Sequence, residues 1–393
     1  MAGSDDFASL SLFLATPEQV VESRRRTWVQ WGRGLTIEQY LERDASMDSL
    51  EHARDGKLRT WVLAPRSDPT TLEFKCACET FRRVGLISGT SAGAVPEEVV
   101  CYGVASVFTP AQYRRKGYAN HMMRLLHWVL GARDTTATFP DAWGTPPEEI
   151  DGVPRGICSV LYSDIGPDFY RKCGKTPEDE GWVLRGANAT VWNVEETLAR
   201  MTGAEKSAGE WRWLDEDECK TVWEDDERRM RKDLVEAAAA LAQSEPRVDS
   251  LFTVLPGGGT AASQIARSKF YLQASGKPEA DAAWGVALYG EQDSIDGYAT
   301  WTLDLPAPTM ILTRLRAIDE TFAGLLARVL KAAKKAGMTR VEAWNLPLHL
   351  QGVAKDLGGE YEDRKDHLSA ISWYGKEHPG EVHWLFNERF CWC

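Results

Sequence analysis

The chain has 393 residues, of which 43% are hydrophobic and 26% are charged, and its formal net charge is −12. This length predicts two domains with ordinary globular cores, and the acidic balance argues against nucleic acid as a partner. No stretch approaches the roughly 20 apolar residues of a membrane span, and no signal peptide is apparent, so we expect a cytoplasmic protein that contacts no membrane.

Two helices are predicted near the N-terminus, between short strands. Thr16-Pro17-Glu18 is typical of a helix start, and Gly32 and Gly34 end this helix after about Trp31. A second helix is predicted to begin at Thr36 and to include Tyr40. The alternating or apolar runs around these helices predict strands over residues 9–15, 57–65 and 74–88.

Residues 99–130 combine a strand, a basic turn and a helix in direct succession. The apolar run 99–108 predicts a buried strand that ends before Pro110. The cations of the turn stand just before a helical apolar face formed by Met122, Leu125, Leu126 and Val129. Backbone N–H groups of such a turn and of the first helical turn can converge on a pyrophosphate. The alternative is an exposed basic turn before an ordinary helix.

A second segment has the same strand-then-helix character. Residues 158–164 predict a strand, and the motif Phe169-Tyr170-Arg171-Lys172-Cys173-Gly174 follows. Together the two segments resemble the GNAT superfamily of acyl-CoA-dependent N-acyltransferases. The pyrophosphate loop of that superfamily, Gln/Arg-x-x-Gly-x-Gly/Ala, is matched by Arg114, Gly117 and Ala119, and its Phe-Tyr-x-Lys-x-Gly motif is matched around Tyr170.

The resemblance implies an α/β fold with a mixed, largely antiparallel sheet flanked by helices, and acetyl-CoA as co-substrate. It implies that acetyl-CoA contacts a strand end and the loop with its helix start, namely Val107, Phe108, Thr109, Arg114, Arg115, Lys116, Gly117, Tyr118, Ala119 and Asn120. Tyr170 is expected to protonate the departing thiolate, the alternative being a core aromatic residue. Asp164 and Ser163 stand where the family often has Asn. The two N-terminal helices form one wall of the acceptor site in this superfamily, so its candidates are Trp28, Trp31 and Tyr40, although packing under the sheet is an alternative for them.

The general base is left open between two hypotheses. Family members often use a Glu or Asp through water, and Glu79 on the strand over residues 74–88 is one candidate. The other is the terminal carboxylate of Cys393, because the chain stays apolar to its last residue and is expected to pack there as a strand. The eight cysteines are read as reduced thiols, and Cys76-x-Cys78 as one strand face instead of a metal site.

The second half repeats the coarse order of the first. The closing strands of the first domain are predicted at 182–184 and 189–192, which gives domains over residues 1–198 and 210–393. A second, degenerate GNAT-like fold is expected in the latter, without nucleotide binding, because it lacks the Arg-x-x-Gly-x-Gly/Ala loop. Gly257-Gly258-Gly259 is interpreted as a hinge or loop with no apolar helix after it. The long Pro-rich segment 133–155 is expected to be poorly ordered or to form a lid near the acyl-CoA cleft.

Nearly the whole chain is similar to the fungal lysine N-acetyltransferase family. The similarity rests on ASVFTPAQYRRKGYA, VLYSDIGPDFYRKCG, the length and the ending NERFCWC. It implies transfer of acetyl from acetyl-CoA to the side-chain amine of free L-lysine. Another small amine, such as a polyamine or an amine-bearing metabolite, is an alternative acceptor, and a non-catalytic CoA-binding protein is an alternative function.

Overall fold

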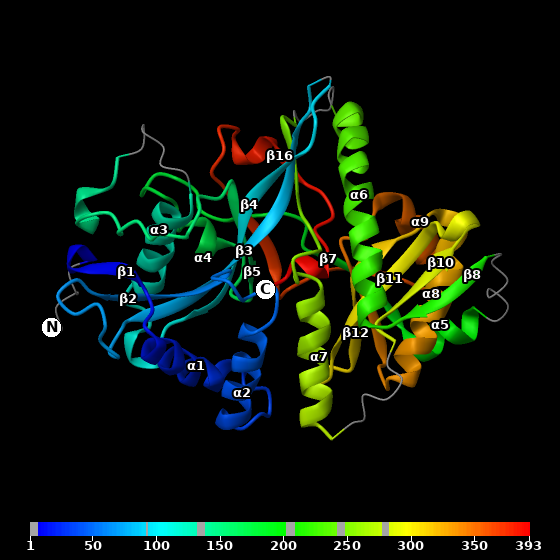
Figure 1. The fold of residues 1–393 in the computed structure, drawn as a ribbon, viewed down its shortest axis with the longest axis horizontal. Coiled ribbons are helices and arrows are strands. Elements are labelled where there is room, and N and C mark those ends of the chain that lie inside the picture. Colours follow the sequence, from blue (N-terminus) through cyan, green and yellow to red (C-terminus); the bar gives the residue numbers. More distant parts are fainter. Residues whose placement is uncertain (1–6, 92, 132–137, 202–208, 242–247, 277–282) are drawn as a thin grey trace.

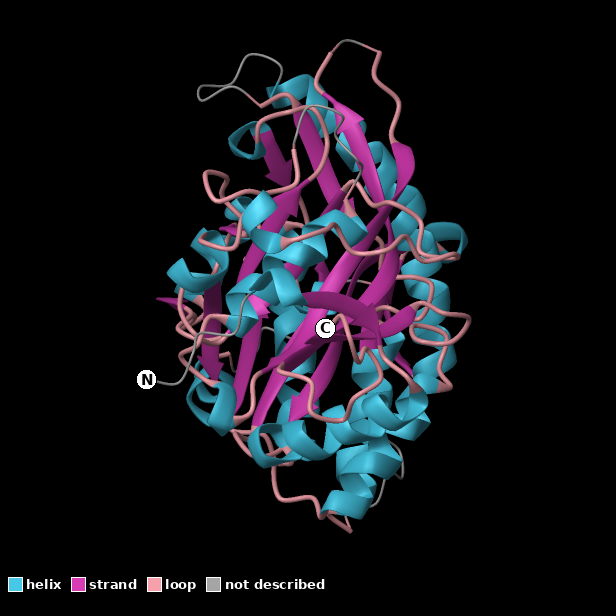
Figure 2. Cartoon of the chain, turned by 90° about the vertical axis from the view of Figure 1, so that its left-hand side faces the viewer, coloured by secondary structure: helices cyan, strands magenta, loops and turns pink. Residues whose placement is uncertain are grey.

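A computed structural model describes residues 7–91, 93–131, 138–201, 209–241, 248–276 and 283–393. These residues form two twisted sheets that lie beside one another, each flanked by helices (Figure 1). Figure 2 shows the chain from the left-hand side of Figure 1, with strands through the middle of the molecule and helices around them. The expected α/β class, with mixed and largely antiparallel sheets, is confirmed. Within the described ranges, no helix has both the length and the apolar content needed to cross a bilayer.

The first sheet has nine strands in the order β1-β2-β3-β4-β5-β15-β6, while β9 pairs with β3 and β16 with β9. Helices α1 and α2 lie on one side of it, and α3 and α4 on the other (Figure 1). Its strands are β1 (Leu10–Leu14), β2 (Leu58–Pro65), β3 (Cys76–Gly89), β4 (Glu97–Phe108), β5 (Cys158–Ser163), β6 (Val183–Leu184), β9 (Ser250–Val254), β15 (Leu368–Trp373) and β16 (Val382–Trp384). The helices are α1 (Pro17–Trp31), α2 (Ile37–Asp48), α3 (Tyr118–Leu130) and α4 (Asp168–Arg171).

The second sheet has seven strands in the order β14-β7-β13-β12-β11-β10-β8. The strands are β7 (Asn188–Asn193), β8 (Glu210–Leu214), β10 (Gly285–Tyr289), β11 (Ile295–Asp304), β12 (Thr309–Arg316), β13 (Arg340–Trp344) and β14 (Glu360–Asp363). The remaining helices are α5 (Val194–Arg200), α6 (Glu216–Leu241), α7 (Ala262–Ala274), α8 (Asp319–Lys335) and α9 (Leu348–Asp356).

The two sheets exchange strands, which the sequence patterns did not predict. Residues 189–192 were expected to close the first sheet, but β7 pairs with β13 and β14 in the second. In return, β9, β15 and β16 come from the second half and extend the first sheet. A short apolar run shows that a strand exists but not which strand it pairs with, so the expectation for 189–192 was wrong. The division at residues 198–210 stays a prediction.

The triple glycine at 257–259 lies in a turn, as expected, and the helix α7 that starts at Ala262 has few apolar positions. One other local expectation was wrong. The chain end is not a strand: Arg389–Cys391 form a 3-10 turn in which Phe390 and Cys391 are fully buried. The expectation that the end is packed is therefore confirmed, and only its conformation differs.

The segment 133–155 was expected to cover the cleft. Residues 132–137 lie outside the described residues, but residues 138–155 pack against α3. Trp143 is buried, and Arg155 donates hydrogen bonds to the carbonyls of Trp128 and Val129 at the end of α3. None of the residues 138–155 lines the large cavity described below, so the lid expectation was wrong for this part of the segment.

The helices next to the cavity begin at well-formed caps. Thr16 and Gln19 exchange hydrogen bonds at the start of α1, and Thr36 and Gln39 do the same at the start of α2. Such reciprocal bonds satisfy backbone N–H groups that have no partner inside the helix. They fix where each helix starts, and so they fix which residues α1 and α2 turn toward the sheet.

Strand β4 leaves its neighbour β5 before it ends. The parallel pairing of β4 and β5 covers only residues 101–104, and its last pair is Val104 with Leu161. On the other edge, β4 stays paired with β3 as far as Phe108, with a bulge between Ala105 and Phe108. Ser106 lies in this bulge with a φ of 54°, which is rare for a residue other than glycine. Residues 105–108 therefore present one backbone edge to open space instead of to a strand.

Candidate active site

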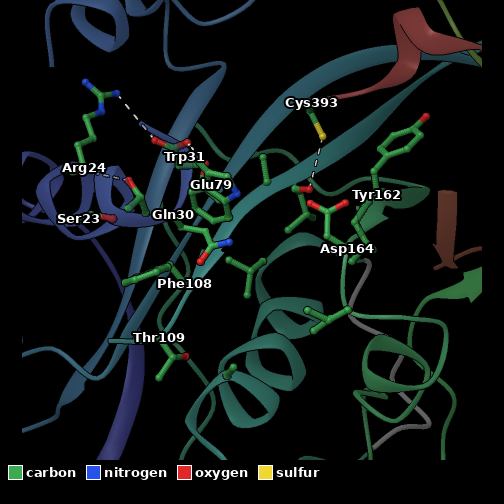
Figure 3. Close-up of a pocket in the computed structure, with 18 of the residues that line it drawn as sticks. Ser23, Arg24, Gln30, Trp31, Glu79, Phe108, Thr109, Tyr162, Asp164 and Cys393 are labelled. Carbon is green, nitrogen blue, oxygen red and sulfur yellow. Dashed lines mark hydrogen bonds and ion pairs between the residues drawn. The ribbon is translucent and has the colours of Figure 1, made fainter. Parts of the chain in front are cut away.

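A cavity of about 660 Å³ opens where β4 and β5 separate. Its walls come from α1, α2, the ends of β4 and β5, the start of α3, and the C-terminal residues Trp392 and Cys393. Figure 1 shows the C-terminus at the centre of the molecule, between the two sheets. Figure 3 shows residues of α1 on one side of the cavity and Tyr162, Asp164 and Cys393 on the other. The cavity thus joins segments from both ends of the chain.

The predicted pyrophosphate loop forms one mouth of this cavity. Nine of the ten residues expected to contact acetyl-CoA line it, and only Lys116 does not. Gly117 caps α3 with a φ of 86°, and Arg115 also has a positive φ, 60°. The first intrahelical bond is donated by the His121 N–H to the Gly117 carbonyl, so the amides before it point out of the helix. A helix N-terminus in this setting attracts an anion, and the exposed guanidinium of Arg115 adds positive charge.

The splayed end of β4 supplies the second part of the site. Val107, Phe108 and Thr109 line the cavity, as expected from the resemblance. Because β5 has already diverged, backbone N–H and C=O groups on this edge are not taken up by a parallel neighbour. Such groups can receive an extended amide-bearing chain by strand-like hydrogen bonds, and an N–H among them can polarise a carbonyl.

Tyr170 stands at the inner wall of the same cavity. It belongs to the short helix α4, lies against Phe169 and Trp182, and is 9% exposed. Among the described residues, none is hydrogen-bonded to its hydroxyl group. Burial raises the pKa of this hydroxyl well above its usual value, with Cys173 and Asp164 adding to the effect. The group is therefore protonated at neutral pH and available as a hydrogen-bond and proton donor.

Glu79 faces the cavity from the adjacent strand β3. Its carboxylate accepts a hydrogen bond of 2.7 Å from the Ser106 hydroxyl, and its other oxygen lies 3.8 Å from the Arg24 guanidinium. Burial raises the pKa of Glu79 above its usual value, while Arg24 opposes this shift. A carboxyl group with a raised pKa is suited to accept a proton near neutral pH. The Ser106 bulge thus positions this group as well as the strand edge.

The acceptor wall contains two of the three aromatic residues expected there. Trp31 lines the cavity edge-on to Phe108, with ring centroids 6.0 Å apart. Tyr40 lines it as well, is 3% exposed, and shares a hydrogen bond of 3.1 Å with the Thr27 hydroxyl. Trp28 does not line the cavity, because its indole N–H donates to the Leu35 carbonyl at the turn between α1 and α2.

A charged network on α1 and α2 was not predicted. Arg24 binds Asp48 through two hydrogen bonds of 2.8 Å, and Arg43 donates to Asp44. All four side chains line the cavity. Their helical spacing is visible in the sequence, but charged residues at such spacing usually mark a solvated surface, so the pattern gives no signal of a site.

Cavity residues from the second half were largely missed. Cys393, proposed as a base through its carboxylate, does line the cavity, and its thiol donates to the Val104 carbonyl at 3.4 Å. Arg83 of β3 holds the preceding segment by donating to the Cys391 carbonyl at 2.6 Å. Arg267 of α7 also lines the cavity. No sequence motif marks Arg267, because its place depends on how the two halves pack.

His367 and Asp164 close the far wall. The backbone N–H of His367 donates to Asp164 at 2.9 Å, and a ring nitrogen lies 3.0 Å from the same oxygen. Burial alone would raise the pKa of Asp164, but the contacts with His367 outweigh it and hold that pKa below its usual value. Asp164, at the position where the family often has Asn, is thus already occupied by a contact within the protein.

Comparison with known proteins finds one matching family and two relatives. Residues 190–393 match the family described as LYC1 GNAT-like C-terminal domain. A protein named lysine acetyltransferase from Yarrowia lipolytica is 27% identical over 161 residues, which is 41% of this chain and 39% of the relative. An uncharacterized protein of Saccharomyces cerevisiae is 22% identical over 92% of each chain.

The likeness extends to a solved structure. A conserved protein of unknown function from Enterococcus faecalis, described as a probable N-acyltransferase, has the same fold. It matches 93% of this chain and 72% of its own, with a TM-score of 0.52 and 11% identity. At that identity the likeness shows the fold alone. The family match covers residues 190–393, which is just over half of the chain. The chain therefore belongs to the family described as LYC1 GNAT-like C-terminal domain.

Proposed function

We propose that this protein transfers acetyl from acetyl-CoA directly to the side-chain amine of free L-lysine in a ternary complex. One observation carries the proposal: a single cavity is lined by the anion-attracting start of α3, the open edge of β4, the Tyr170 hydroxyl and the Glu79 carboxylate. Acyl transfer needs a held thioester, a deprotonated amine, a stabilised oxyanion and a protonated leaving group, and these four features correspond to those needs.

The acetyl-CoA end of the proposal rests on the loop and the strand edge. The pyrophosphate would bind at the amides around Gly117, with Arg114 and Arg115 contributing positive charge. The pantetheine arm would then run along residues 105–108 and bring the thioester between β4 and β5. The left-handed Gly117 and the small Ala119 leave room for a close approach of phosphate oxygens to the backbone.

The chemical step uses Glu79 and Tyr170 in opposite roles. The lysine ammonium first loses a proton to Glu79, directly or through water. The neutral amine forms a C–N bond with the thioester carbon, and the carbonyl oxygen takes up negative charge beside the β4 backbone. The C–S bond then breaks, the thiolate takes the proton of Tyr170, and the nitrogen loses its second proton to solvent. The proton held by Glu79 then passes through solvent to the Tyr170 oxygen, which restores both side chains. The products are the acetylated amine, CoA thiol and one released proton.

Lysine as the acceptor rests on the name of the Yarrowia lipolytica relative. Asp48 and Asp44 line the cavity but are paired with Arg24 and Arg43, whereas the Glu79 carboxylate can face a cationic amine before it is deprotonated. The match to that relative covers 39% of its length, so another small amine remains the alternative acceptor. Domains at residues 1–198 and 210–393 and a cytoplasmic location stay predictions within the same proposal.

The experiment measures CoA release from acetyl-CoA with free amino acids and polyamines, for wild type, Tyr170→Phe and the control Tyr361→Phe. Tyr361 is an exposed residue of β14 that does not line the cavity. We expect lysine-dependent release that falls about 100-fold in Tyr170→Phe and is unchanged in the control. Release with a different amine would replace lysine but keep the chemistry. CoA binding without release for any amine would support the non-catalytic alternative.

A further inference from the structure

A second cavity of about 350 Å³ adjoins the first, and both are lined by Arg267, His367 and Trp392. Most of its other walls come from the second sheet, including Thr309 and Ile311 of β12 and Trp344 of β13. The second domain therefore reaches the candidate active site through these shared residues. The charges in this second cavity are not needed by the proposed transfer chemistry, so they call for an explanation of their own.

Arg389 is the most unusual of these charges. It is 7% exposed and lines the second cavity, yet its Nε and Nη1 atoms are buried without a hydrogen-bond partner in the described part of the chain. Its guanidinium stacks on the ring of Trp392, 3.9 Å from the centroid, and lies 4.7 Å from that of Trp344. Stacking covers the faces of a guanidinium but leaves its N–H groups in the plane, where they need acceptors. An unpaired buried charge is costly unless a ligand completes it.

Arg267 approaches the same indole from α7. Its guanidinium lies 5.1 Å from the Trp392 ring centroid, and among the described residues it forms neither an ion pair nor a hydrogen bond. Burial, followed by repulsion from Arg267, lowers the pKa of Arg389 to about 9. Glu342 and Asp304 oppose this lowering of the Arg389 pKa, but among the described residues no carboxylate forms an ion pair with either arginine. Two guanidinium groups on one indole without a paired carboxylate form a place for an anion.

Four carboxylates line this cavity, those of Asp304, Glu342, Glu362 and Asp366, and among the described residues none of them forms an ion pair with Arg267 or Arg389. Asp304 pairs with Arg33 at 3.2 Å, and Glu342 accepts the indole N–H of Trp344 at 2.6 Å. Both nevertheless line the same cavity and give it a mixed character. They would repel a doubly charged phosphate more than a carboxylate, and they can face an ammonium group. A zwitterionic amino acid head group, with one carboxylate and one ammonium, matches this lining.

We propose that Arg267 and Arg389 bind the carboxylate of the acceptor amine, so that the second domain selects amino acids over simple amines. This inference rests on the proposed function, because it assumes that the side-chain amine reaches Glu79 and Tyr170 from the shared wall. Trp392 then has a defined task, which is to hold the two guanidinium groups apart and in position. A polyamine lacks the carboxylate and would leave both arginines unpaired.

The test compares L-lysine with 1,5-diaminopentane, which is the same chain without the carboxylate. The variants are Arg267→Gln, Arg267→Lys and Arg389→Gln, and the control is Arg212→Gln on β8, a partly exposed arginine that pairs with Glu210 and Asp293 and lines neither cavity. We expect Arg267→Gln to lower kcat/KM for lysine by about 10- to 100-fold, the loss typical of a charge-assisted bond. Turnover of the diamine and KM for acetyl-CoA should stay unchanged, and Arg267→Lys should restore part of the loss.

Arg389→Gln is expected to act like Arg267→Gln, and thermal unfolding checks that this buried variant is folded. If it is not folded, the activity of Arg267→Gln alone tests the carboxylate site, because the Arg267 side chain is only half-buried.

Equal losses of activity for lysine and the diamine, or no loss for either, would overturn the carboxylate site while leaving the transfer reaction intact. Lysine binding is measured by calorimetry in parallel. If wild type binds lysine but does not acetylate it, and Arg267→Gln abolishes the binding, the carboxylate site holds and the proposed function is overturned. If lysine binds equally well to wild type and to both arginine variants, the carboxylate site is overturned.

Discussion

The central strands of the two sheets, β4 and β12, are built alike but end in different surroundings. Each pairs antiparallel with the strand before it and parallel with the strand after the next helix. Parallel pairing stops at Val104 in β4 and at Leu312 in β12, and each strand then continues past a bulge. Both halves therefore contain the strand separation that makes room for a ligand.

The difference lies in what fills the separation. Beside β12, the Glu388 carboxylate accepts the Leu315 N–H at 2.8 Å and pairs with Arg314, and the 3-10 turn Arg389–Cys391 follows it. The chain itself thus occupies the opening in the second sheet. Beside β4 the opening remains a cavity.

The connections from β4 to α3 and from β12 to α8 also differ, both in length and in charge. Nine residues, 109–117, join β4 to α3, and they include three cations and the left-handed Gly117. Only residues 317 and 318 join β12 to α8, which begins with Asp319 and Glu320. Acidic side chains at a helix start satisfy the helix dipole and repel phosphate. We therefore expect a nucleotide to bind at the open separation beside β4, with its positively charged turn, and not beside β12.

The largest expected effect comes from removing the Glu388 carboxylate, which lies in the strand separation beside β12. Glu388→Ala removes a carboxylate from the buried Arg314, whose side chain is 2% exposed and whose remaining carboxylate partner is Asp226. We expect the free energy of unfolding to fall by about 3 kcal/mol, measured by urea denaturation. The control Glu362→Ala breaks an exposed pair with Arg340 and should cost less than about 1 kcal/mol. A stability of Glu388→Ala equal to that of the control would show that the opening is not sealed by this contact.

The next effect concerns the open side. Glu79→Gln should lower kcat by about 100-fold, because an amide cannot accept the amine proton. Since burial raises the folded-state pKa of Glu79, its stabilising contribution is present at low pH and is lost as pH rises through that pKa. At neutral pH the amide variant should therefore unfold at the same or a higher Tm. In wild type, kcat/KM should fall as pH drops through the pKa of Glu79. Full activity of Glu79→Gln would show that Glu79 is not the general base, and the terminal carboxylate of Cys393 would be the next candidate.

A matched pair of glycines compares the two helices. Gly117→Ala forces a side chain into a backbone with φ of 86° and brings its Cβ to 3.0 Å from the Phe7 ring. We expect KM for acetyl-CoA to rise about 10-fold, because the left-handed conformation costs an alanine roughly 1–2 kcal/mol. Gly337→Ala after α8 has a φ of 73° and open space around it. It should lower stability slightly and leave KM unchanged. An equal effect of both variants on KM would show that the loop around Gly117 does not contribute to acetyl-CoA binding.

The smallest expected effect is electrostatic. Arg115→Gln should raise KM for acetyl-CoA by about threefold at low salt and by less at high salt, because this side chain is exposed and screened. Initial rates at two ionic strengths measure it. A salt-independent rise would mean that Arg115 acts through a close hydrogen bond instead of through its charge.

Local patterns predicted the parts of the site that are contiguous in sequence. The strand, loop and helix over residues 99–130 carry their own signals in apolar run length, glycine placement and helical periodicity. The motif around Tyr170 is equally compact. This is why all but one of the residues expected at the loop and strand end line one cavity. Their individual roles remain predictions.

The remaining parts depend on packing between distant segments. Arg267, Arg389 and Trp392 meet only because α7 and the chain end return to the first sheet. No local sequence pattern near these residues predicts that they contact one another. Trp28 shows the converse. It lies three residues before Trp31 on the same helix, yet its indole packs against Gly32 and donates a hydrogen bond to the Leu35 carbonyl, away from the cavity. Aromatic residues at helical spacing do not reveal which of them faces a cavity.

The most direct test of the account is a crystal structure of the protein with CoA and lysine bound. The account predicts one CoA per chain, with its pyrophosphate on the amides around Gly117 and its sulfur between β4 and β5 near the Tyr170 hydroxyl. The lysine amine should lie on the Glu79 side of that sulfur, and no CoA should occupy the opening beside β12. CoA bound at the second sheet, or a sulfur far from Tyr170, would contradict the account.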